Sequence, residues 1–126
     1  MKRLHAIMSD VDLSDIPEEN KHGDCFVVAL NTFLKKPKRY TLVHGVVTGQ
    51  GPLDGIEYCH AWVIDENTDT VIDNTLPPGS NKYPVDIYYA IGNISITREY
   101  DYRGVLEMVD KYETYGPWDP VFNNYP

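Results

Sequence analysis

The chain has 126 residues, of which 42% are hydrophobic and 24% are charged, and its formal net charge is −8. That length and composition fit a single domain spanning residues 1–126 with a hydrophobic core, and they argue against global disorder. Because the negative charge repels phosphate backbones and no run approaches the roughly 18 apolar residues of a membrane helix, we expect neither nucleic acid nor a membrane as a partner.

The N-terminal segment, residues 1–22, is polar and irregular, with a short helix expected near Ile16 to Asn20. Its apolar run is short and soon followed by acidic residues, unlike a secretion signal. We therefore expect the protein in the cytoplasm, which is the host's if a phage encodes it. In that reducing compartment the two cysteines, Cys25 and Cys59, are expected to be free thiols.

From Cys25 the chain is expected to form a buried helix that Asp24 caps and Pro37 ends. Alternating and β-branched residues then predict a run of strands. These are Tyr40 to Thr48, Tyr58 to Asp65, Thr70 to Thr75, Asp86 to Ile91 and Ile94 to Glu99. A second helix over Asp101 to Tyr115 and an extended tail complete the chain. This order predicts an α+β fold in which the N-terminal helix packs on a mainly antiparallel sheet.

Cys25 is the first candidate for chemistry because it begins the predicted helix directly after Gly23 and Asp24. The unpaired N–H groups and the dipole at a helix start favour a thiolate, and the same N–H groups can donate to an oxyanion. Asp24 is a candidate for supporting that oxyanion site. The alternative is a core cysteine, since free cysteine is among the most buried residue types.

His60 and Asp73 are expected on neighbouring strands, within side-chain reach of each other. If Asn67 and Thr68 form a two-residue hairpin tip, Asp73 becomes a same-face diagonal neighbour of His60, with backbones about 7–8 Å apart. A loop one residue longer brings Asn74 opposite His60 instead, so Asp73 and Asn74 both remain open as its partner. A histidine on an apolar face can also be a core residue with its hydrogen bonds satisfied.

Three further features are weaker candidates for supporting the cleft. His44 lies in the strand LVHGVV and is expected to be structural, unless its ring reaches the cleft and helps to bind substrate. Trp62 is expected to form a wall beside the catalytic residues. The glycine-rich loop, residues 49–55, lacks the context of a nucleotide loop and is expected to form a mobile flap beside the site. Since CxxC, CxxH and HxxxH spacings are missing, we expect no metal and no cofactor.

The order of GDCFVVALNTFL, HAWVI and VIDNT resembles the core of the transglutaminase-like branch of papain-like cysteine enzymes. Arylamine acetyltransferases are similar in outline. This resemblance covers Gly23 to Thr75 and implies Cys25 as nucleophile, His60 as base and Asp73 as orienter. Because the chain is shorter than such enzymes, hydrolysis or deamidation of a peptide or protein amide is favoured over transfer to an amine.

The whole chain is also similar to small phage and bacterial proteins of unassigned function that carry LVHG, a glycine-rich loop, HAWV, VID and YGPW in this order. The sequence therefore supports two hypotheses. The first is a cysteine hydrolase or acyltransferase that forms a thioester on Cys25. The second is a non-catalytic binding or inhibitory module, such as a phage protein that engages a host protein through its acidic tail and the tyrosine-rich segment IYYAIG.

Overall fold

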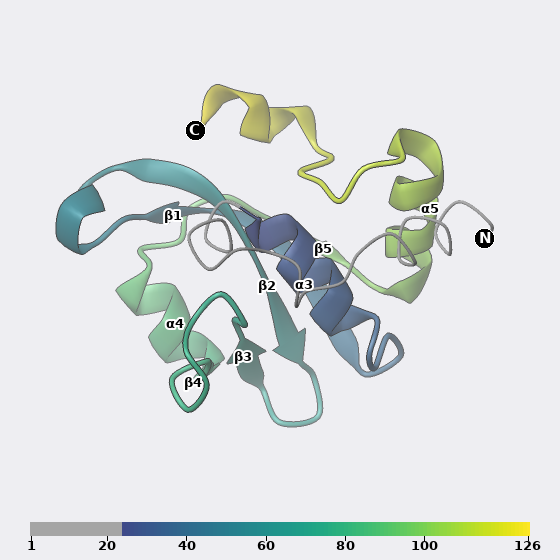
Figure 1. The fold of residues 1–126 in the computed structure, drawn as a ribbon, viewed down its shortest axis with the longest axis horizontal. Coiled ribbons are helices and arrows are strands. Elements are labelled where there is room, and N and C mark those ends of the chain that lie inside the picture. Colours follow the sequence, from purple (N-terminus) through teal and green to yellow (C-terminus); the bar gives the residue numbers. More distant parts are fainter. Residues whose placement is uncertain (1–23) are drawn as a thin grey trace.

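The computed structural model describes residues 24–126 (Figure 1). The short helix expected near Ile16 to Asn20 lies outside the described residues. Within residues 24–126 the chain has an α+β fold with a five-stranded antiparallel sheet and three α-helices. A search of the same residues finds no helix long and apolar enough to span a bilayer.

Helices and strands are interspersed along the described chain, and all five strands come before the last α-helix. The helices are α3 (Cys25–Phe33), α4 (Val85–Ile91) and α5 (Tyr102–Tyr112). The strands are β1 (Tyr40–Thr48), β2 (Glu57–Asp65), β3 (Thr70–Ile72), β4 (Lys82–Pro84) and β5 (Thr97–Tyr100). Two 3₁₀ helices are η2 (Gly51–Leu53) and η3 (Pro120–Asn124). The strand order β4-β3-β2-β1-β5 puts β2 at the centre of the sheet.

The two long strands were predictable from local pattern, and the segment after them was not. β1 has the bounds expected from its β-branched residues, and β2 begins one residue earlier than expected. The prediction of a strand over Asp86 to Ile91 is wrong, because this segment forms α4. Its tyrosines favour a strand locally, but in the helix Tyr88 and Tyr89 both pack against the indole of Trp62. This tertiary contact outweighs the local propensity.

The remaining differences lie at the ends of elements and in the loops. β4 forms within a segment expected to be loop, and β5 begins three residues later than the strand expected from Ile94. The second helix is shorter than expected, and the Asp101 side chain caps it by accepting a hydrogen bond from the Gly104 N–H at 2.8 Å. The tail was expected to be extended throughout, but it contains η3.

The sheet separates two layers of hydrophobic core. Successive residues of a strand face opposite sides. Ala61 and Val63 of β2 therefore join the core cluster that includes buried residues of α3 and α5, whereas Trp62 and Ile64 join the cluster that α4 covers. The side chains of α3 form much of the first layer, and this packing holds the start of the helix against the sheet.

Asp24 occupies the N-cap position of α3, as expected, but its side chain makes no capping hydrogen bond. Its backbone angles, φ −107° and ψ 29°, differ from the extended conformation in which an N-cap side chain reaches back to the helix N–H groups. The expected cap by the Asp24 carboxylate is therefore wrong. Its carbonyl oxygen instead accepts the first helical hydrogen bond, from the Val28 N–H at 3.0 Å.

Candidate active site

The β2–β3 hairpin has the register that a tip at Asn67 and Thr68 predicts. Asp65 pairs with Thr70, and the ladder continues in that register to Ile72, the last residue of β3. Asp73 follows immediately, diagonal to His60. The longer hairpin loop, which brings Asn74 opposite His60, is therefore wrong.

His60 and Asp73 are bonded directly to each other. The Nε2 atom of His60 lies 2.9 Å from Oδ2 of Asp73, and both side chains are largely shielded from solvent, with 12% and 4% exposure. Asp73 is thus the carboxylate in contact with the His60 ring. Because Nε2 makes this contact, Nδ1 is the ring nitrogen left for another partner.

The Asp73 carboxylate is held by a complete set of donors. Oδ2 also accepts a hydrogen bond from the Tyr88 hydroxyl at 2.7 Å, and Oδ1 accepts from the backbone N–H and the hydroxyl of Thr75. Burial by itself raises the pKa of Asp73, but the hydrogen bonds from His60, Thr75 and Tyr88 outweigh it and lower the pKa. The carboxylate is therefore ionised at neutral pH.

His60 is a buried imidazole whose charged form is stabilised. Burial lowers its pKa, but hydrogen bonds and negative charge from Asp73 and Cys25 raise it to about 10. Because Cys25 is one of the groups that raise this pKa, its thiol lies near enough to act on the ring electrostatically. Cys25, His60 and Asp73 therefore form one connected group, drawn from the start of α3, from β2 and from the residue after β3.

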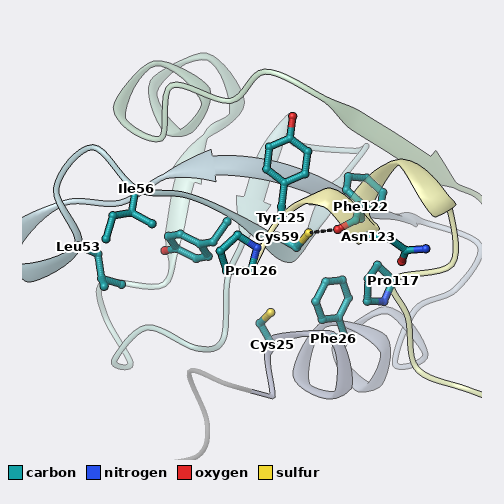
Figure 2. A pocket seen from close by; sticks show the side chains of 11 residues that line it. Cys25, Phe26, Leu53, Ile56, Cys59, Pro117, Phe122, Asn123, Tyr125 and Pro126 are labelled. Carbon is teal, nitrogen blue, oxygen red and sulfur yellow. Dashed lines mark hydrogen bonds between the residues drawn. The ribbon is translucent and has the colours of Figure 1, made fainter.

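Cys25 is the first residue of α3 and is 4% exposed, but its side chain lines a cavity of about 620 Å³. Figure 2 shows its sulfur pointing into this cavity, toward the side on which Cys59 and Pro126 lie. Both cysteines are free thiols. Cys59 is half-buried and lines the same cavity, and burial, followed by the negative charge of Cys25, raises its pKa.

A polar chain connects the segment that carries Asp73 to the helix that carries Cys25. The Asn81 side-chain amide donates to Oδ1 of Asn74 at 2.8 Å, and Asn74 in turn donates from Nδ2 to the Thr32 hydroxyl at 2.8 Å. Thr32 completes the chain by donating to the Val28 carbonyl of α3 at 2.9 Å. Asn74 thus joins the two elements of the site, in place of the contact with His60 that the longer loop implied.

His44 does not reach the cleft, so the structural alternative is the one found. Its ring is fully buried, and neither of its nitrogens has a hydrogen-bond partner among the described residues. Four aromatic rings, which we call the aromatic cage, surround it: Phe26, Tyr100, Trp118 and Phe122. Burial in this cage lowers the pKa of His44 to about 3, which keeps the ring neutral.

Trp62 and the glycine-rich loop lie beside the site, as expected. The Trp62 side chain is fully buried, with ring centroids 6.1 Å from His60 and 5.5 Å from Tyr88, so it forms a wall. Leu53, in the glycine-rich loop, lines the Cys25 cavity and also a second cavity of about 350 Å³ that contains His60 and Asp73. Tyr58 also lines both cavities and so lies between them.

Sequence reasoning missed Tyr88 and Thr75 as partners of Asp73. Thr75 could have been found, because an Asp followed two residues later by a Thr is a common local turn in which the carboxylate accepts from the backbone. Tyr88 carried no usable signal, since its segment was expected to form a strand. Its hydroxyl reaches Asp73 only because the segment is helical and packs on the sheet.

Metal binding and known relatives give no alternative explanation of this site. Within residues 24–126, no group of three or more His, Cys, Asp or Glu side chains is arranged to hold a metal ion. No family model, no curated protein and no solved structure matches the chain. A function for this chain is therefore inferred from the geometry and the chemistry of the site.

Proposed function

We propose that the protein is a cysteine enzyme with a transglutaminase-like, papain-like core, acting on a peptide or protein amide. Cys25 is the nucleophile, His60 the base and Asp73 the orienter. The observation that carries the proposal is the position of His60, which contacts the Asp73 carboxylate at 2.9 Å while Cys25 contributes to its raised pKa. A nucleophile, a base and an orienting carboxylate are the requirements of acyl transfer through a covalent intermediate.

The proposed reaction has two steps, formation of a thioester on Cys25 and its hydrolysis. His60, whose pKa of about 10 keeps the ring protonated at neutral pH, holds the proton that the Cys25 thiol gives up, and the sulfur attacks the amide carbon, forming a C–S bond and an oxyanion. Backbone N–H groups in the first turn of α3, beginning with that of Cys25, can donate to this oxyanion. His60 returns the proton to the leaving nitrogen, the C–N bond breaks, and an amine departs from the thioester.

In the second step, His60 takes a proton from water, and the hydroxide attacks the thioester carbon. The C–S bond then breaks, the sulfur recovers the proton, and a carboxylic acid leaves. Hydrolysis of a side-chain amide by this route releases ammonia and is a deamidation, whereas an amine in place of water gives acyl transfer.

The proposal is tested by the rate at which iodoacetamide alkylates each cysteine near neutral pH, measured by peptide mass spectrometry. The reagent is small enough for the Cys25 cavity, and we expect Cys25 to react about tenfold faster than Cys59, because His60 promotes its thiolate. Asp73→Asn removes the orienting charge and is expected to slow Cys25 about tenfold. The matched control is Asp86→Asn, which neutralises an exposed carboxylate of α4. Equal and slow alkylation of both thiols contradicts the proposal.

The competing hypothesis of a binding module has less support from the surface. In the segment IYYAIG, Tyr88 and Tyr89 pack on the sheet, and the Tyr88 hydroxyl is bonded to Asp73. These rings are therefore not the exposed contact surface expected from the sequence. A pull-down with Cys25→Ala separates the two hypotheses, because an inhibitor keeps its effect on a partner and an enzyme loses it.

A further inference from the structure

The edge of β2 beside Cys25 is in contact with the last residues of the tail. β3 pairs with residues 63–65 of β2, so within residues 24–126 the backbone around Cys59 has no strand partner on that side. On the other side, Cys59 faces Val46 of β1, whose own N–H donates to the Ile96 carbonyl. The Cys59 N–H therefore points outward, and it donates to the carbonyl oxygen of Pro126 at 3.0 Å. This is one rung of the ladder that an added strand makes.

The same place is continuous with the apolar cavity of Cys25. Its volume of about 620 Å³ is within the range of a ligand pocket, and its lining is mainly apolar. The side chains that make it apolar include Phe26, Leu53, Ile56, Tyr58 and Phe122. Figure 2 shows Pro126 lying over the sulfur of Cys25 and next to Cys59. A backbone donor, an apolar cavity and the proposed nucleophile thus meet at one point.

We propose that this edge binds an extended peptide that carries a bulky apolar side chain, and that residues 123–126 are an internal plug that such a peptide displaces. This inference rests on the proposed function. The peptide carbonyl takes the place of the Pro126 oxygen on the Cys59 N–H, and its apolar side chain enters the cavity. The scissile or side-chain amide then lies within reach of Cys25.

The tail is anchored before the plug and only weakly held within it. Trp118 and Phe122 are buried in the aromatic cage, and Asp119 bonds to Arg98 at 2.7 Å. In residues 123–126 the side chains are exposed or half-buried, and Pro126 makes the hydrogen bond to the sheet. The plug can therefore open while the anchor and the core stay in place.

The test compares a small and a bulky thiol reagent, iodoacetamide and fluorescein maleimide, on Cys25. The variant Asn123→stop removes the plug and keeps Trp118 and Phe122. We expect the ratio of the bulky to the small rate to rise about tenfold in this variant, because the bulky reagent needs the plug open. A full-length variant, Asn123→Gly with Asn124→Gly, loosens the plug without truncation and is expected to raise the ratio by a smaller amount. If the ratio of the bulky to the small reagent's rate is unchanged in both variants, the proposal that residues 123–126 form a plug is overturned.

The ligand class is tested on the truncated variant with two hexapeptide amides that differ at one residue, phenylalanine or aspartate. We expect the phenylalanine peptide to slow iodoacetamide alkylation of Cys25 about threefold or more at millimolar concentration, and the aspartate peptide to have no effect. Equal protection by both peptides overturns the apolar specificity. Asp73→Asn distinguishes this inference from the proposed function: it lowers both reagent rates and leaves their ratio unchanged, so each claim fails by its own measurement.

Discussion

Two buried histidines on adjacent strands have opposite electrostatic environments. His44 on β1 pairs with Ala61 and points into the aromatic cage, whereas His60 on β2 pairs with Gly45 and faces the other side of the sheet. The pKa of His44 is lowered to about 3, and that of His60 is raised to about 10. Burial lowers the pKa in both cases. The difference lies in the partners of each ring, since Asp73 and Cys25 raise the pKa of His60, whereas neither nitrogen of His44 has a hydrogen-bond partner within residues 24–126.

This comparison shows what makes a buried histidine suited to chemistry. A ring enclosed by aromatic side chains stays neutral and serves packing, even when the surrounding sequence, LVHG, is as distinctive as HAWV. A ring that carries a carboxylate on one nitrogen can exchange a proton through the other. A histidine that is merely close to the cleft, in sequence or in space, is not thereby suited to proton transfer.

The largest expected effect is on the pH dependence of stability. Unfolded His44 takes a proton near pH 6.5 and folded His44 only near pH 3, so its contribution makes the protein less stable as pH falls through this window, by up to about 5 kcal/mol. Folded His60 holds its proton to about pH 10, so its contribution is present below pH 6.5 and is lost as pH rises toward 10. Urea unfolding from acid to alkaline pH measures both slopes.

Two variants test whether His44 causes the acid slope of the unfolding free energy against pH and His60 the alkaline slope. His44→Leu is expected to flatten the acid limb and leave the alkaline limb unchanged, and His60→Gln is expected to flatten the alkaline limb. If the acid limb of His44→Leu is as steep as that of the natural chain, the comparison between the two rings is wrong.

Gly45→Ala is expected to have the next largest effect, because this residue lies between the two environments. A Cβ atom here meets the Trp62 ring at 2.5 Å and the Ile96 carbonyl at 3.0 Å. We expect a loss of about 1–3 kcal/mol in the free energy of unfolding, with shifted NMR signals for the His60 ring, against which Trp62 packs. Gly104→Ala on α5 is the control, and because the closest atom that a Cβ there meets belongs to the flexible Asp101 carboxylate, at 3.2 Å, the expected loss is smaller than at Gly45. If the NMR signals of the His44 ring shift more than those of the His60 ring in Gly45→Ala, the expected contact with Trp62 is not the cause.

Tyr88→Phe is expected to have the smallest effect and refines the description of His60. The variant removes the hydroxyl that donates to Asp73 at 2.7 Å, so the pKa of Asp73 rises and stability falls by about 1 kcal/mol. The acid limb of the Cys25 alkylation profile is therefore expected to move to higher pH by about half a unit to one unit. Tyr89→Phe is the control, since that ring packs on Trp62. Identical profiles for both variants exclude a positioning role for Tyr88.

The elements that position His60, Asp73 and Cys25 could largely be predicted from local sequence. The register expected from a tip at Asn67 and Thr68 is the one found, although residues 66–69 all form the turn, and this register brings Asp73 beside His60. The position of Cys25 at a helix start follows from the change of pattern after Gly23 and from the apolar run that follows. These features depend on residues close together in the chain, where periodicity and turn chemistry act directly.

By itself, the amino-acid sequence determined β1, β2, the hairpin and the start of the first helix, because their patterns repeat over a few neighbouring residues. Tertiary structure alone decided that residues 85–91 are helical, that Tyr88 completes the shell around Asp73, that His44 is enclosed by the aromatic cage, and that Pro126 lies over Cys25. Each of these depends on contacts between segments distant in the chain. Burial and packing energies between such segments exceed the preferences of any one of them, so no local pattern records the outcome.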